Sequence, residues 1–448
     1  MTVTVALALL LQAAGIMLLR VGLGRCWLRR PVTLLYLAAV ASQGLPAVLL
    51  AFPSVRQWDT FRSGITPGYA GEAALLTSAA MLALAVGYLL TRPQRVIPAA
   101  GTQHRTAAIT ALDWRLLALS CVPLAVLTYE GKGYNNGTGI IVGASLGTDL
   151  AATFFTILVI ITAFSVLLRT GPRWFLPILI GQSASLAAAG ERTPVLTGAV
   201  ALAIMATRAG LRPSRAQGCA AAALTLLAIV AVTGARANQG RTLFYSNSGL
   251  GARSAALGAA ALGGTSSQPD SPGLAAQLAS RLDADAFTGG ILQSEALGQP
   301  RLSAAYVPES LLVTVPSALW PSKLARGYAL DPAILETDDF GLQQINFLPG
   351  LPGLYAGFLS PPWLGLLMAC LGALFGRAER WLLRECTPAR LVLLAGAVTA
   401  ALGYQGGLPA MLLDLRAAAV IAAAVRAIEA VRVRRRGLAP DLEPLPLS

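Results

Sequence analysis

The chain has 448 residues, of which 55% are hydrophobic and only 12% are charged, and its formal net charge is +13. A soluble fold covers its core with a polar and charged surface, so this composition excludes an ordinary soluble protein. The arginines stand singly or in short groups between apolar runs, without a basic stripe interleaved with aromatic residues, and this excludes a nucleic-acid-binding protein.

Eleven apolar segments, taken in chain order, predict helices that cross a membrane. The chain start lacks a basic region and a small-residue cleavage site before its apolar run, so we expect a retained first helix. The expected spans are residues 3–19, 32–52, 72–91, 113–129, 150–168, 174–190, 194–208, 218–235, 359–376, 390–404 and 408–425. Because crossing the hydrocarbon takes about 20 apolar residues, the fold class is an all-α polytopic membrane protein with about 11 transmembrane helices, within roughly 10 to 12.

The loops between these segments divide the charged residues unevenly. Most of the 34 lysines and arginines fall on one side, and most of the 21 acidic residues fall on the other. Cytoplasmic loops carry an excess of Lys and Arg, so we expect the N-terminus outside and the C-terminus in the cytoplasm. The seven tryptophans lie at or near the expected span ends, as an aromatic belt requires.

The expected spans divide the chain into four parts. Residues 1–235 form a membrane domain with about eight spans, 236–358 one long external loop, 359–428 the C-terminal spans, and 429–448 a cytoplasmic tail. A loop of this length usually has a function or is disordered. Its Trp, Tyr and Pro segments favour order, and we expect a helix near 273–297.

Arginines on the external side are the first candidate site residues. Arg192 lies in the turn AGERTP (189–194), and Arg236 and Arg241 follow the eighth expected span. A guanidinium binds phosphate with two hydrogen bonds and stays charged, so these side chains could hold a diphosphate at the membrane surface. The alternatives are a charged turn at the water boundary and arginines that extend to lipid headgroups.

Two further groups lie in the long loop. The segment VPSALWPSKLARG (315–327) offers Lys323 and Arg326 beside an interfacial tryptophan, although an amphipathic loop explains it equally well. A loop carboxylate could accept the proton of a sugar hydroxyl, although solvated loop acids are commoner. The acids considered for this role are Asp283, Asp285, Asp331, Glu336, Asp338 and Asp339.

The last expected span contains a charged pair, Asp414 and Arg416. Residues two apart do not share a helix face, so each needs its own partner, and structural pairing is the default for charges inside a membrane. The preceding turn, 404–407, could also line a site. The five cysteines and single histidine have no metal-ligand spacing and no nucleotide-binding motif is present, so we expect no metal and no cofactor.

Three segments carry a resemblance to a known family: AGERTP (189–194), VPSALWPSKL (315–324) and LPGLYAGFLSPPWLGLLMACLGALFG (351–376). The first is similar to a Gly-x-Arg turn, the second to a Pro-x-x-x-Trp-Pro-x-Lys segment, and the third contains Tyr-x-x-Phe before a small-residue helix. Together with the order of spans and loop, they resemble the O-antigen polymerase (Wzy-type) family of bacterial oligosaccharide repeat-unit polymerases. The Ser-Pro-Pro at 360–362 departs from the Gly that the family more often has there.

The resemblance implies a metal-independent glycosyltransferase of the bacterial plasma membrane, similar in fold to the C-type glycosyltransferases. Its substrate would be undecaprenyl-diphosphate-linked oligosaccharide, its surroundings membrane lipid, and one partner a chain-length regulator. The diphosphate leaving group needs cations that stabilise its developing charge. The residues assigned to substrate binding are Arg192, Arg236, Arg241, Lys323, Arg326 and Tyr355, and those assigned to proton transfer are Asp338 and Asp339.

Two alternatives remain open. A lipid-linked glycan ligase would have the same architecture, but ligases commonly use an external histidine, and the only histidine here, His104, is expected in a basic-side loop. A polysaccharide or lipid transporter should have two similar halves with broken helices and charge inside several spans, neither of which is clear in this sequence.

Overall fold

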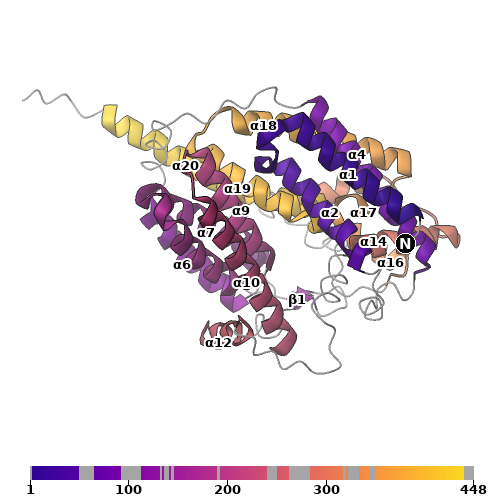
Figure 1. The fold of residues 1–448 in the computed structure, drawn as a ribbon, viewed down its shortest axis with the longest axis horizontal. Helices are drawn as coiled ribbons and strands as arrows, with labels where there is room; N and C mark the ends of the chain where they lie inside the picture. Colours follow the sequence, from indigo (N-terminus) through magenta and orange to yellow (C-terminus); the bar gives the residue numbers. More distant parts are fainter. Residues whose placement is uncertain are drawn as a thin grey trace, which may run out of the picture.

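The computed structural model describes residues 3–49, 65–91, 113–131, 134–135, 141–142, 146–188, 192–239, 250–261, 283–315, 319–320, 332–342 and 349–437. Within these residues a helix lies in each of the eleven ranges expected to span the membrane (Figure 1). These helices are α1 (Val3–Leu23), α2 (Pro31–Leu49), α4 (Pro67–Leu90), α6 (Trp114–Gly131), α7 (Leu146–Thr170), α8 (Phe175–Ala188), α9 (Arg192–Arg208), α10 (Arg215–Gln239), α18 (Pro361–Arg384), α19 (Pro388–Leu402) and α20 (Gly407–Gly437).

Seven of the described helices are long and apolar enough to cross a bilayer: α1, α2, α4, α7, α10, α18 and α20. The helices α6, α9 and α19 contain shorter apolar stretches, and α8 has 14 residues. The chain is therefore an all-α, multi-pass membrane protein, as the sequence predicts. One feature was not predicted: between α6 and α7, strand β1 (Tyr134–Asn135) pairs antiparallel with β2 (Ile141–Val142).

The eleven helices in the expected ranges form two groups. In the first, α4 packs against both α1 and α18. In the second, the consecutive helices α6 to α10 pack on one another and on the hairpin of α19 and α20. Helix α2 joins the groups because it contacts α4 on one side and α19 on the other (Figure 1). Short 3-10 helices lie at the turns, namely η1 (Gly24–Arg29), η3 (Pro172–Trp174) and η6 (Tyr404–Gly406).

Glycines allow α4 and α18 to approach closely. A side chain at Gly372 would collide with the carbonyl of Leu84, and one at Gly87 would collide with the carbonyl of Ala369. Gly372 and Gly376 form a Gly-x-x-x-Gly pair, which is typical of tightly packed membrane helices. The glycines therefore allow the two backbones to come into direct contact, beside the large apolar side chains that both helices also bury.

A buried ion pair lies at one end of the first group. Arg30 Nη1 donates to Glu379 Oε1 at 2.8 Å, and the Tyr88 hydroxyl donates to the same oxygen at 3.0 Å. Charge inside several spans was not clear in the sequence, and this pair places a further charge, Glu379, on a second long apolar helix, α18. The span expected to end at residue 376 continues as helix to Arg384, and this carries Glu379 into the helix interface.

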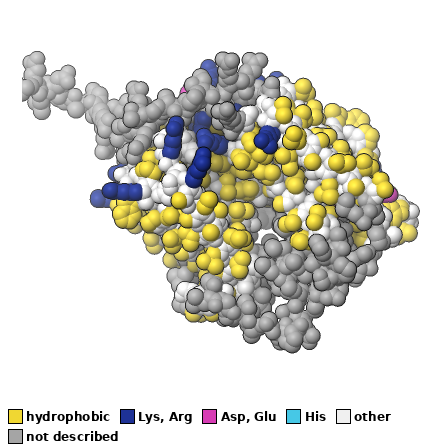
Figure 2. Space-filling view, in the orientation of Figure 1, with side chains coloured by type: hydrophobic (Ala, Val, Ile, Leu, Met, Phe, Trp, Pro, Cys, Tyr) yellow, Lys and Arg dark blue, Asp and Glu magenta, His cyan; other side chains and the backbone are white. Residues whose placement is uncertain are grey.

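The long loop contributes α12 (Leu250–Ala261), α14 (Ala284–Ala296), α15 (Tyr306–Leu311), η4 (Leu312–Thr314), α16 (Pro332–Asp339) and α17 (Gly350–Gly353). The helix expected near 273–297 is α14, and residues 262–282 lie outside the described part. The elements α14 to α17 pack where α4 and α20 begin, and α12 packs against the end of α10; we call this side of the helices the loop end. Basic side chains gather toward the opposite end, where α20 finishes (Figure 2), which we call the basic end.

Candidate functional site

The loop helix α14 packs against α4 inside the membrane domain. Asp283 and Asp285 at its start are buried, with 1% and 0% of their surfaces exposed. The Thr77 hydroxyl donates to Asp285 Oδ1 at 2.8 Å. Thr77 lies about 15 Å along α4 from its first residue, at the rise of an α-helix. A carboxylate of the loop is therefore held beside the middle of a helix that is long and apolar enough to cross a bilayer.

Small residues make the close contact between α14 and α4 feasible. A Cβ at Gly289 would lie 3.3 Å from the Cα of Ala70, so a larger residue would push the helices apart. At the far end of α14, Arg301 and Glu295 form a two-pronged ion pair on the surface, with distances of 2.6 and 2.7 Å. Helix α14 thus runs from a buried start to an exposed end.

A second loop segment, residues 349–358, is also buried in the membrane domain. A side chain at Gly350 would meet the ring of Tyr404, and a Cβ at Gly353 would lie 2.8 Å from Thr288 Oγ1. Gly350 has a φ of +74°, a conformation that favours glycine. Non-helical backbone at membrane depth is tolerated only where protein or water surrounds it, and here protein does.

The buried segment contains a phenol, Tyr355, and contacts the carboxylate of Glu336. Glu336 on α16 has no exposed surface, and its Oε1 accepts the Gly357 backbone N–H at 2.9 Å. The Tyr355 hydroxyl lies 3.3 Å from the Ser310 hydroxyl. Burial raises the pKa of the Tyr355 phenol above its usual range, and the nearby Glu336 charge acts in the same direction. Tyr355 therefore stays protonated and can donate a hydrogen bond.

A further bond connects this region to α2, since Gln43 Nε2 donates to the Tyr404 hydroxyl at 2.8 Å. The buried polar side chains at the loop end come from the loop and from three parts of the membrane domain, α2, α4 and η6. We call them the polar cluster: Gln43, Thr77, Asp285, Thr288, Glu336, Tyr355 and Tyr404. The cluster can hold a proton-accepting carboxylate and a phenol donor in a water-poor environment.

The sequence-predicted residues fall in different places. Tyr355 belongs to the polar cluster. Asp338 and Asp339 lie at the end of α16 and are exposed, whereas Glu336, on the same short helix, is buried. Helix α16 is held against α14, because Ser294 Oγ donates to the Phe340 carbonyl at 3.1 Å. Asp338 and Asp339 are therefore exposed on a helix whose position is fixed by its contact with α14. Lys323, Arg326, Asp331 and Arg241 lie outside the described residues.

The remaining predicted arginines, Arg192 and Arg236, lie at the first residue of α9 and in the last turn of α10. Their side chains lie outside the described part. The structure adds Arg253 on α12, which is 1% exposed and donates from Nη1 to the Ala188 carbonyl at 3.4 Å. Ala188 is the last residue of α8, just before the turn that leads to Arg192. The fold thus brings Arg253 beside that turn.

Helix α12 also packs against the end of α10. Ala235, which precedes Arg236, forms an apolar cluster with Ala256 and Ala260 of α12. This stretch was expected to be part of the long external loop, and Arg253 was not among the candidate residues. A lone arginine among small apolar residues was the signal, because such a stretch can form a helix whose one cation must find a partner.

The charged residues of α20 have separate surroundings. Arg416 Nη1 donates to the Thr314 carbonyl of η4 at 2.7 Å, so a loop element supplies its partner. The carboxylate of Asp414 lies toward Gly403, since a Cβ on that glycine would be 3.7 Å from Asp414 Oδ2. Arg416 therefore connects the loop element η4 to α20, in agreement with the expected structural role.

Among the residues that the structure describes, no group of three or more His, Cys, Asp or Glu side chains is placed to hold a metal ion. The polar cluster and the arginine positions are thus the groups available for chemistry in the described part of the chain. Compared with known proteins, the chain matches no family model, no curated sequence and no solved structure.

Proposed function

We propose that the protein joins undecaprenyl-diphosphate-linked oligosaccharide repeat units into a polysaccharide at the outer face of a bacterial plasma membrane. In this proposal all eleven helices cross the membrane, the loop end faces outward and the C-terminus lies in the cytoplasm. The main support is the loop end itself, where acidic loop helices pack into the membrane domain opposite the basic end. Membrane enzymes that use lipid-linked substrates need polar groups at this depth, close to the headgroup.

The proposed reaction uses groups at the loop end. The acceptor hydroxyl oxygen attacks the anomeric carbon of the growing glycan, and the bond from that carbon to the diphosphate oxygen breaks. The electron pair leaves with the lipid diphosphate, whose charge is stabilised by Arg192, Arg236 and Arg241. The hydroxyl proton passes to Asp338 or Asp339, whose exposure leaves them open to a substrate.

Three groups are assigned to substrate positioning. Lys323 and Arg326 add positive charge for the diphosphate, and Tyr355 donates a hydrogen bond from a buried phenol. The buried carboxylates Asp285 and Glu336 serve a different purpose, because each already accepts a hydrogen bond from a neighbouring element. They hold α14 and the segment 349–358 in place beneath the substrate.

Deletion of the gene tests the proposal directly. We expect cells to lose long surface polysaccharide and to accumulate single lipid-linked repeat units on the outer face. Complementation with Arg192→Ala, Arg236→Ala or Arg241→Ala should leave the protein in the membrane but restore no long chains. Arg301→Ala is the matched control, since this surface arginine of the same loop is paired with Glu295 and should restore normal lengths.

Other outcomes identify the alternatives. Repeat units trapped on the cytoplasmic face would indicate a transporter, and long chains left on the carrier lipid would indicate a ligase. Normal chain lengths in all three arginine variants would remove the proposed diphosphate site.

A further inference from the structure

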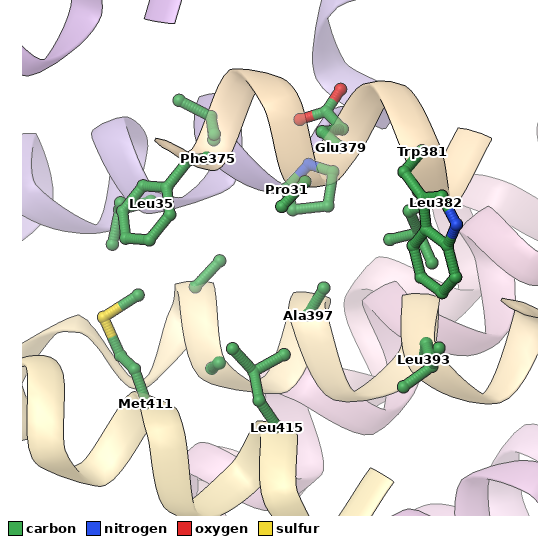
Figure 3. Close-up of a pocket in the computed structure, with 14 residues that line it drawn as sticks. Pro31, Leu35, Phe375, Glu379, Trp381, Leu382, Leu393, Ala397, Met411 and Leu415 are labelled. Atoms are coloured by element: carbon green, nitrogen blue, oxygen red, sulfur yellow. The ribbon is translucent and has the colours of Figure 1, made fainter. Parts of the chain in front are cut away.

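A slot lies between α18 and the α19–α20 hairpin, away from the polar cluster (Figure 3). Its volume is about 170 Å³, and it is lined by apolar side chains such as Leu35, Phe375, Leu393 and Leu415. Glu379 is the one charged residue of the lining. Figure 3 shows its carboxylate turned away from the slot, toward the side where Arg30 and Tyr88 bind it. The slot therefore offers hydrocarbon contacts but no polar partner for water.

Two walls of the slot belong to different packing units, and α2 closes it with Pro31, Val32 and Leu35. Helix α18 packs on α4, and α19 packs on α20, whereas α18 and α19 contact each other only slightly. Trp381 stands on the rim with about half of its surface exposed, on a helix that crosses the membrane. The slot is therefore accessible from the hydrocarbon of the bilayer, whose chains match its lining.

A cation stands at the basic end of this slot. Arg390 precedes Leu393 and Ala397 on α19 by three and seven residues, so it continues the face that lines the slot. Its guanidinium lies over the Trp381 ring, 4.9 Å from the ring centre. The apolar slot and the cation are thus parts of one surface.

The two terminal nitrogens of the Arg390 guanidinium have different surroundings. Nη2 lies 3.3 Å from Glu385 Oε2, on a carboxylate side chain that is 56% exposed. Nη1 is buried and has no hydrogen-bond partner within the described ranges. A buried guanidinium nitrogen without an acceptor is costly. The position also disfavours a lone cation, because Arg390 lies in the first turn of α19, where the helix dipole favours an anion.

We propose that the slot binds a chain of an anionic phospholipid from the leaflet at the basic end, with its phosphate on the guanidinium of Arg390, whose side chain is 15% exposed. Hydrocarbon in the slot gains little over hydrocarbon in the bilayer, so the chain alone gives no selectivity. The charge of the headgroup supplies this selectivity, and the exposed Arg377 on α18 adds to the local positive potential. This lipid would fill the gap between α18 and α19 and connect the two helix groups.

Native mass spectrometry of the purified protein tests the proposal with phosphatidylglycerol and, as the neutral control, phosphatidylcholine. We expect one phosphatidylglycerol to be retained, and Arg390→Gln to weaken its binding about tenfold or more, as for a lost charge-assisted hydrogen bond. Arg384→Gln is the matched control, since this arginine is exposed at the same end, and it should bind normally. Ala397→Phe should also prevent binding because it fills the slot.

Three results would overturn the proposal. They are equal retention of the two lipids by the unmodified protein, undiminished phosphatidylglycerol binding by Arg390→Gln, or a protein dimer that Ala397→Phe separates, which would make a second copy the occupant. Helix content and elution volume are measured for each variant. If Ala397→Phe misfolds, the comparison of Arg390→Gln with Arg384→Gln still decides the question.

Discussion

The buried ion pair between Arg30 and Glu379 supports a quantitative prediction. Both side chains are almost completely buried, with 6% and 3% of their side-chain surfaces exposed. In Arg30→Met the cation is lost, while the carboxylate keeps its hydrogen bond from the Tyr88 hydroxyl at 3.0 Å. Removing one partner of a buried ion pair typically costs about 3–5 kcal/mol, so we expect the free energy of unfolding to fall by that amount.

The double variant Arg30→Met/Glu379→Leu separates this explanation from simple loss of packing. Replacing both charges by apolar side chains is often neutral or stabilising, so the double variant should recover the cost of the unpaired charge. It should keep a loss of about 1–3 kcal/mol, because the buried Tyr88 hydroxyl no longer has an acceptor. Reversible unfolding in mixed micelles, followed by tryptophan fluorescence, measures both values. Arg384→Met, a change at an exposed arginine of α18, is the control. A double variant that loses the sum of the single losses would refute the reasoning.

Three further predictions concern helix packing, a buried hydrogen bond and the orientation in the membrane. Gly372→Leu should force α18 away from α4 and lower thermal stability by about 1–3 kcal/mol, whereas Gly365→Leu on the same helix meets open space and should not. Thr77→Val should cost about 1–3 kcal/mol in micelle unfolding, because the buried carboxylate on α14 loses a donor; no loss would contradict the bond. In a cysteine-free background, an impermeant reagent added outside should label a cysteine at 280 but not at 214, and the reverse would overturn the orientation.

The positions of the membrane helices could be predicted because local hydropathy determines them. Each of the eleven apolar runs is helical, and the errors lie at the ends. Hydropathy falls after residue 376, but nothing breaks the helix before the extended Glu385, so α18 continues and buries Glu379. Its partner Arg30 lies almost 350 residues earlier. Such a pair depends on tertiary packing, which local patterns do not contain.

The candidate site was predictable only in part, for the same reason. In the sequence, the loop acids look alike, although the structure buries Asp285 and Glu336 and leaves Asp338 and Asp339 exposed. The difference arises from contacts of α14 with α4, and of α16 with segment 349–358, over long sequence separations. One signal was available: Gly353 and Gly357 in LPGLYAGF permit the close approach that encloses Thr288 and Glu336.

The contact between α4 and α18 bears on how the protein is made. Helix α4 leaves the ribosome early, but α18, whose glycines contact α4, is translated only after the whole long loop. Helices α6 to α10, in contrast, find their neighbours next to them in the chain. We expect nascent chains stopped after Gln239 to resist protease within α6–α10 while α4 is still digested. Equal protease resistance of α4 and of α6–α10 would show that the first group packs before α18 is synthesised.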